Sequence, residues 1–185
     1  MANTYTLIEA KTLTATAASV TFTSIPQTYT DLLLKFSCRS TSTAGADIYA
    51  NLKIQFNSDT GNNYNGILVF SNLSSPGSGS YTAQAGNLFS YANGNVTTAS
   101  TFSNGELYIP NYTSSNQKIS SVDCVVENNA TNGFVELAAE KWSGTSAITT
   151  IDVVSLYGLH TANSNFYLYG IKNSEQLRRN NAKPN

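Results

Sequence analysis

The main feature of the sequence is an alternation of apolar and polar residues that recurs along most of its length. From Ile48 to Phe56 every second residue is apolar, and the residues between them are Tyr, Asn, Lys and Gln. This period of two predicts a strand with one buried face. Similar runs predict further strands at 4–10, 19–24, 31–38, 66–70, 106–109, 118–127, 147–155 and 165–171.

The segment 19–40 contains two such runs, joined at Ile25-Pro26. In the second run Leu32, Leu34, Phe36 and Cys38 share one face, which we expect to point into a core. Cys124 alternates with valines in the same way, so both cysteines are expected to be small buried apolar residues. A disulfide between them is left open, because two cysteines alone do not define a disulfide framework.

The segment 134–142, "FVELAAEKW", suits either a helix or a strand by composition. Asn132-Gly133 just before it is a hairpin signal, which favours a strand paired with 118–127. Further Asn-Gly steps and prolines also fall between the apolar runs. Together these features predict an all-β fold, a single antiparallel β-sandwich that is jelly-roll-like and has about eight to ten strands.

Two segments depart from this rhythm. Residues 71–103 are rich in Ser, Gly, Asn and Ala and are expected to form a long loop that carries Tyr81, Phe89 and Tyr91. The chain from 173 to 185 is expected to be a basic arm beyond a domain spanning 1–172. The end of the chain holds four of the ten basic residues against one acid, and these are interface candidates: Lys172, Arg178, Arg179 and Lys183. A solvated, frayed terminus is the alternative.

Composition supports an ordered chain with a weakly charged surface. The 185 residues suit one domain, and 8 Phe and 11 Tyr supply apolar surface for a core. Charged residues make up only 11% of the chain, and the net charge of −1 provides no general attraction to nucleic acid or anionic lipid. No apolar run is long enough to span a membrane, so neither a membrane nor a nucleic acid is expected as a partner.

Candidate catalytic residues are few. His160 is the only histidine and is expected at a strand end, as a surface or turn residue. Glu136 and Glu140 resemble a glycosidase pair, but on a strand they lie about 13 Å apart, beyond the usual separation. We therefore expect them to form a solvated outer face, and we expect no enzymatic activity and no cofactor.

The segment 56–65, "FNSDTGNNYN", places oxygen-bearing side chains around Gly61. Such side chains can bind Ca²⁺, but the segment offers one carboxylate and does not match an EF-hand loop. It is therefore expected to be a turn between strands.

Several aromatic residues fall in or beside the expected loops, where tyrosine can stack on sugars or fill a partner's pocket. A surface with few charges and many tyrosines is typical of contact with other proteins. The residues are Tyr64, Tyr81, Phe89, Tyr91, Tyr108 and Tyr112.

Four strings occur in a fixed order along the chain: "SVTFTSIPQTYTDL" (19–32), "IQFNSDTGNNYN" (54–65), "KWSGTSAITTIDV" (141–153) and "NFYLYGIK" (165–172). As a set they resemble a family of small β-sandwich virion proteins of tailed bacteriophages, especially phages of aquatic bacteria. The resemblance extends over roughly residues 4–172 and carries no catalytic residue. The basic tail and the segment 71–103 lie outside its strings.

The resemblance implies a structural virion protein that is made in the host cytoplasm. We expect a capsid decoration or cement protein, a homo-oligomer and most simply a trimer, that binds the major capsid protein or another virion protein. The segment 71–103 and the termini would carry the contacts. The alternative is a tail or fibre-head module that binds host-surface glycan through tyrosines such as Tyr81 and Tyr91. A glycan-active enzyme would require turnover by Glu136 or Glu140.

Overall fold

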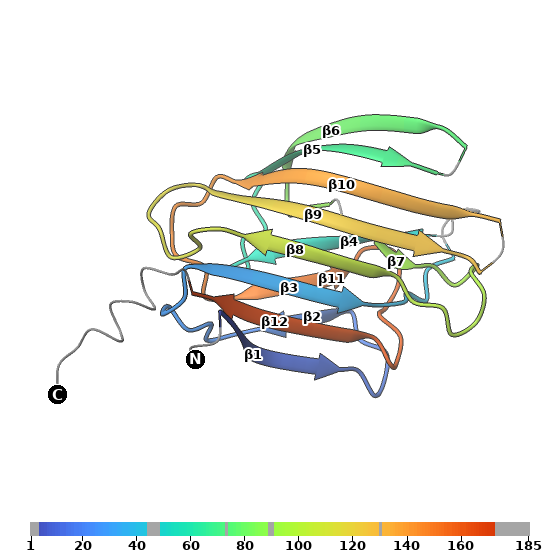
Figure 1. Cartoon of the computed structure of the whole chain (residues 1–185), viewed down its shortest axis with the longest axis horizontal. Helices are drawn as coiled ribbons and strands as arrows, with labels where there is room; N and C mark the ends of the chain where they lie inside the picture. The colour runs from blue at the N-terminus through green and yellow to red at the C-terminus, as the bar shows by residue number, and fades with distance from the viewer. Residues whose placement is uncertain (1–3, 44–48, 73, 89–90, 130, 173–185) are drawn as a thin grey trace.

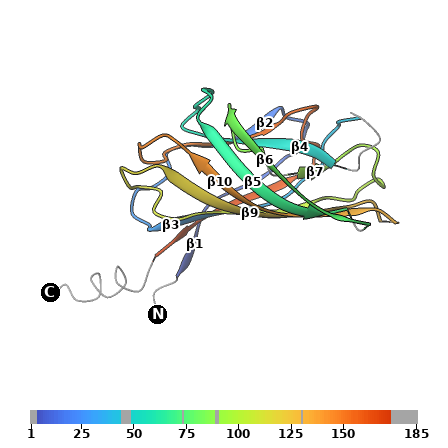
Figure 2. The same cartoon turned by 90° about the horizontal axis from the view of Figure 1, so that it is seen from above.

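The computed structural model describes residues 4–43, 49–72, 74–88, 91–129 and 131–172. Within these ranges the chain forms twelve strands and no helix. The strands make two sheets, which overlap in the view of Figure 1 and separate into two layers in Figure 2. The all-β sandwich predicted from the alternation is therefore confirmed, with more strands than expected.

The larger sheet has eight strands, and each neighbouring pair is antiparallel. Its order across the sheet is β1 (Tyr5–Thr12), β12 (Asn165–Ile171), β3 (Asp31–Ser37), β8 (Asn104–Ile109), β9 (Lys118–Glu127), β10 (Gly133–Trp142), β5 (Tyr64–Ser71) and β6 (Pro76–Gln84).

The smaller sheet has four antiparallel strands, in the order β2 (Ser19–Phe22), β11 (Ile151–Ser155), β4 (Tyr49–Phe56) and β7 (Tyr91–Asn93). It covers one face of the larger sheet, so the inward residues of both sheets share one core. The opposite face of the larger sheet has no second layer in this structure (Figure 2).

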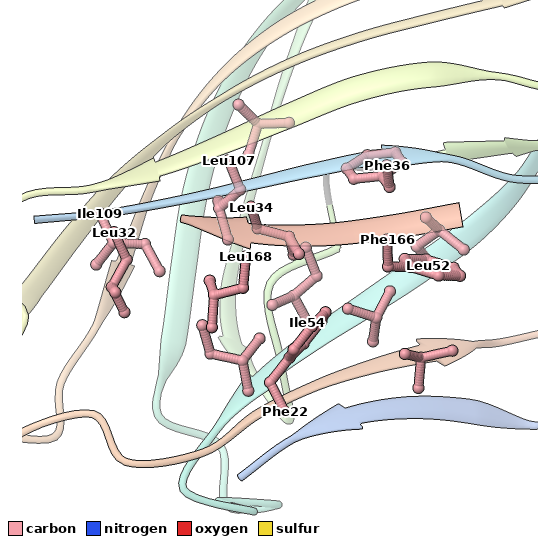
Figure 3. Packing of buried hydrophobic residues seen from close by; sticks show 14 of the residues in the cluster. Phe22, Leu32, Leu34, Phe36, Leu52, Ile54, Leu107, Ile109, Phe166 and Leu168 are labelled. Atoms are coloured by element: carbon pink, nitrogen blue, oxygen red, sulfur yellow. The ribbon is translucent and has the colours of Figure 1, made fainter. Parts of the chain in front are cut away.

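The core between the sheets is built from large aliphatic and aromatic side chains (Figure 3). From the 19–40 segment, Leu32, Leu34, Phe36 and Cys38 are all buried, as the alternation predicts. The two runs of that segment do not pair with each other, because β2 joins the smaller sheet and β3 the larger. Cys38 and Cys124 are both buried free thiols, which confirms their expected place in the core.

The hairpin predicted at Asn132-Gly133 is confirmed. β9 and β10 pair over ten residues each, from Gly133 opposite Glu127 to Trp142 opposite Lys118. Burial alternates strictly along β9, so each inward residue is followed by an outward one. This alternation fixes which side chains reach the outer face.

The expectation of a long loop at 71–103 is wrong. The segment contains the last residue of β5, the β5–β6 connection, strand β6 and strand β7. β6 has the sequence "PGSGSYTAQ", whose Gly and Ser residues have low strand propensity and hide it from pattern analysis. It forms because β5 supplies a template of backbone hydrogen bonds and side chains. A Cβ on Gly77 would lie 2.4 Å from the ring of Phe70, so any other residue would have to displace that ring.

Candidate functional site

The outer face of the larger sheet exposes large apolar side chains from three neighbouring strands. β5, β9 and β10 each place large apolar residues at outward positions, beside polar ones such as Ser121 and Asp123, whereas an antiparallel sheet that meets water usually has a polar outer face. Ile67 is 64% exposed, Ile119 61% and Leu137 57%. Val69, Val125 and Val135 add to the same surface. We call these six residues the apolar face.

The strand register brings five of the six side chains next to one another, and Ile119 lies beyond Ser121 and Ala139, opposite Lys141. Opposite Leu137 on β10 lie Val69 on β5 and Asp123 on β9, and Val135 lies opposite Val125. Together the six side chains expose roughly 600 Å² of surface, at the upper end of what a monomeric protein usually shows as one patch. Exposed patches of this size are often functional.

A hollow of about 670 Å³ lies at one end of the apolar face. Its floor contains the small residues Ser121 and Ala139, which are opposite each other on β9 and β10. The larger side chains of Ile67, Ile119 and Tyr108 surround them. The hollow therefore arises because two small outward residues are flanked by bulky neighbours.

Asp123 is a charged residue among these side chains, on β9 opposite Leu137, and other charges lie beside the apolar face. Lys35 and Glu106 form an ion pair at 2.8 Å on the adjoining strands β3 and β8, and this contact raises the pKa of Lys35. Burial together with the nearby Glu106 raises the pKa of Asp123. Lys141, at the rim of the hollow, forms no ion pair among the described residues.

The expectation that Glu136 and Glu140 form a solvated face is wrong, because both are almost completely buried on the inner face of β10. Glu140 Oε1 accepts a hydrogen bond of 3.0 Å from the Tyr81 hydroxyl. That hydroxyl accepts one from the backbone N–H of Leu88 at 3.1 Å, so the segment after β6 closes over the carboxyl.

Glu136 has a less favourable environment than Glu140. Neither of its carboxylate oxygens has a hydrogen bond of normal geometry among the described residues. Burial raises its pKa to about 7, and the nearby Tyr91 side chain partly opposes that rise. The sequence carried a signal for this burial, because Phe134, Ala138 and Trp142 lie on the same side of the strand as the two glutamates.

Most of the tyrosines expected at the surface are in the core. Tyr64 and Tyr112 are fully buried, and Tyr91 is 7% exposed. The ring of Tyr91 packs against Tyr49 and Phe134, with centroids 4.7 and 5.2 Å away. It therefore offers no free face for stacking on a sugar. Phe89 lies outside the described residues.

His160 is also buried, which contradicts its expected surface position. Its Nε2 lies 3.1 Å from the carbonyl of Val153, and its ring packs edge-on against Phe166. Burial lowers its pKa, so the neutral form is favoured. Its surroundings are those of a core residue.

Two buried cations escaped the sequence analysis. Arg39 is 7% exposed and donates to side-chain and backbone oxygens between Asn95 and Thr101, which fixes that loop. Lys118 donates to the carbonyls of Ser114 and Asn116 at 2.8 and 2.6 Å. Burial lowers the pKa of both side chains. Each cation organises a loop through carbonyl groups, and no pattern along the chain signals such contacts.

The candidate turn at 56–65 is confirmed as a turn between β4 and β5. The Asp59 carboxylate accepts hydrogen bonds from the Gly61 N–H at 2.8 Å and from Trp142 Nε1 at 2.7 Å. These bonds hold the turn against β10. Within the described ranges, no group of three or more His, Cys, Asp and Glu side chains is arranged to hold a metal ion.

The basic residues near the C-terminus divide between described and undescribed parts of the chain. Lys172 Nζ lies 5.6 Å from the ring centroid of Tyr29, and the Lys172 N–H donates to the carbonyl of Thr4. Arg178, Arg179 and Lys183 lie outside the described residues. The structure therefore places Lys172 beside β1 and does not bring it to the apolar face.

No family model matches the sequence, and no curated protein matches it. Across the part of the chain that the structure describes, no helix is both long and apolar enough to cross a membrane. The apolar face is a feature that core packing does not explain.

Proposed function

We propose that this chain is a non-enzymatic structural protein of a tailed-phage virion, most simply a decoration protein that stabilises the head shell. The observation that carries the proposal is the apolar face, since the strands β5, β9 and β10 expose it without a covering layer. A structural protein that works within an assembly needs such a surface. The ordered strings that resemble phage β-sandwich proteins supply the virion context.

The mechanism is mass action. A protein that binds the assembled shell more tightly than its separate subunits shifts the equilibrium toward the assembled state. For a single site, a free concentration of 100 times the dissociation constant corresponds to about 2.7 kcal/mol of added stability. Many copies on one shell multiply this effect, so each contact need only be moderate.

The buried carboxyls support a structural role over glycan hydrolysis. A glycosidase pair must flank a bound sugar at a separation that suits its stereochemistry. Glu136 and Glu140 lie four residues apart on β10, about 13 Å by strand geometry, and both are buried. Glu140 lies beneath the segment after β6, and neither carboxyl is open to solvent.

Co-sedimentation of the purified protein with expanded capsids that lack it tests the proposal. We expect saturable binding, and we expect virions assembled without the protein to lose infectivity on heating sooner than wild-type virions. Adding the protein back should restore the heat tolerance. Absence of binding, together with unchanged heat tolerance of the deficient virions, would overturn the proposal.

A further inference from the structure

On the outer side of β10 the hollow lies next to an exposed large side chain. At the end that carries Lys141, the small residues Ser121 and Ala139 form the floor of the hollow. Toward the other end, Leu137 and Val69 stand out as exposed large side chains in the next row across the strands. Leu137 and Ala139 are neighbours on the outward side of β10, so the projection and the hollow lie next to each other.

We propose that a second copy of this chain covers the apolar face and is related to the first by a two-fold axis. The axis passes above β10, at the point between Leu137 and Ala139. The axis lies between the two faces and runs perpendicular to the strands. Each strand then stacks on its own counterpart in the reverse direction. The Leu137 side chain of each copy enters the hollow above the partner's Ala139.

The strand register shows that this arrangement matches residues by size on β10 and by polarity on β5 and β9. The row of Leu137 contains Val69 and Asp123, and the row of Ala139 contains Ile67 and Ser121. The axis exchanges these two rows between the copies. Val69 therefore meets the partner's Ile67, and Asp123 meets the hydroxyl of the partner's Ser121.

The next rows outward match as well. Ile119 shares a row with Lys141, and Val125 shares one with Val135. After the exchange, Ile119 meets the partner's Val125, and the stem of Lys141 lies on the partner's Val135. Glu127 follows Val125 on the outward side of β9, so the partner's Glu127 lies one row further, toward the Lys141 ammonium. In these rows no charge meets a charge of the same sign.

The apolar area is what a stable dimer needs. A standard interface buries about 800 Å² on each partner, of which about 65% is apolar in homodimers. The six residues of the apolar face expose roughly 600 Å² per copy, close to that requirement. Sheets stacked face to face lie about 10 Å apart with their strands inclined by about 30°, so the match is closest near the axis.

This inference deepens the proposed function, because it assigns a partner to the same surface. It replaces the trimer expected from the resemblance with a two-fold contact, since a patch that matches its own copy closes as a dimer. The smaller sheet and the loops remain available for the shell.

Mass measurement by light scattering during size-exclusion chromatography tests the dimer. At about 50 µM we expect the wild-type protein to have twice the chain mass of 19.8 kDa. Leu137→Glu should give a monomer, because it places a carboxylate in the partner's hollow. The control is Tyr157→Glu, since Tyr157 is 60% exposed just after β11 of the smaller sheet, and this variant should remain a dimer.

Exchanging the large residue Leu137 and the small residue Ala139 tests how the two copies are aligned along β10. Leu137→Ala should weaken the dimer by about tenfold or more, because it leaves two small residues opposite each other. Ala139→Leu should weaken it similarly, because two leucines then compete for one space. The double variant Leu137→Ala/Ala139→Leu places a leucine opposite an alanine again and should recover most of the wild-type affinity. Both positions are exposed, so the folds of these variants should remain intact.

A wild-type monomer or trimer, or a dimer that Leu137→Glu leaves intact, would overturn the inference. So would a double variant that dimerises no better than the two single variants. A dimer that fails to bind expanded capsids would overturn the virion role alone. A monomer that binds them would overturn the dimer alone.

Discussion

At the scale of one residue, Glu136 is a carboxyl that the fold buries without a hydrogen bond of normal geometry among the described residues. Its side chain is fully buried, and burial raises its pKa from 4.5 to about 7. A residue-by-residue pattern identifies Glu136 as one of a pair on a strand face. It does not show whether that face points inward, because three apolar residues and two charged residues lie on the same side of the strand.

We predict that Glu136→Gln stabilises the protein at alkaline pH and has little effect at acid pH. The folded state binds the Glu136 proton more tightly than the unfolded state, so ionisation opposes folding as the pH rises from 4.5 to 7. Above pH 7 the full cost applies, up to about 3 kcal/mol by the size of the shift. The amide removes this cost, so the melting temperature at pH 8 should rise relative to wild type.

The control for this experiment is Glu9→Gln, which breaks an exposed ion pair with Lys11. Exposed pairs contribute less than about 1 kcal/mol, so this variant should behave alike at both pH values. Thermal unfolding at pH 4 and pH 8 makes the comparison. Loss of stability at pH 8 in Glu136→Gln would show that the ionised carboxyl has a favourable partner.

At the scale of the strand, alternation succeeds where one face is apolar and fails where glycine replaces side chains. The bounds of β9 and β12 follow directly from period-two runs, and the pairing of β10 follows from the hairpin signal. β6 gives no such pattern because its inner positions include Gly77 and Gly79, beneath Phe70 and Leu68 of β5. Its strand character comes from its neighbour, which a local pattern does not show.

We therefore predict opposite behaviour for two adjacent positions of β6. Gly77→Val places a side chain 2.4 Å from the Phe70 ring, and displacing the ring should cost about 1–2 kcal/mol. Ser78→Val adds a β-branched side chain on the exposed side and should be neutral or slightly stabilising. Urea unfolding midpoints measure both effects. Equal midpoints would mean that the ring does not constrain β6.

At the scale of the whole molecule, the two faces of the larger sheet have different roles. The inner face packs on the smaller sheet and forms the core, and it holds the buried glutamates and Lys118. The outer face carries the apolar face and the hollow. The alternation and the composition predict the sandwich and its weakly charged surface, whereas nothing in them predicts a contact surface on the sheet rather than on the loops and the tail. The apolar face emerged only when the register brought β5, β9 and β10 side by side, since these strands are adjacent in the sheet and β5 is distant in sequence.

The most direct test of the account is a cryo-electron-microscopy reconstruction of the virion that carries this chain. The account predicts density for a sandwich of eight- and four-stranded sheets on the outside of the head shell, with the apolar face covered by protein. A particle without this density, or one in which Ile67, Ile119 and Leu137 face open solvent, would contradict it.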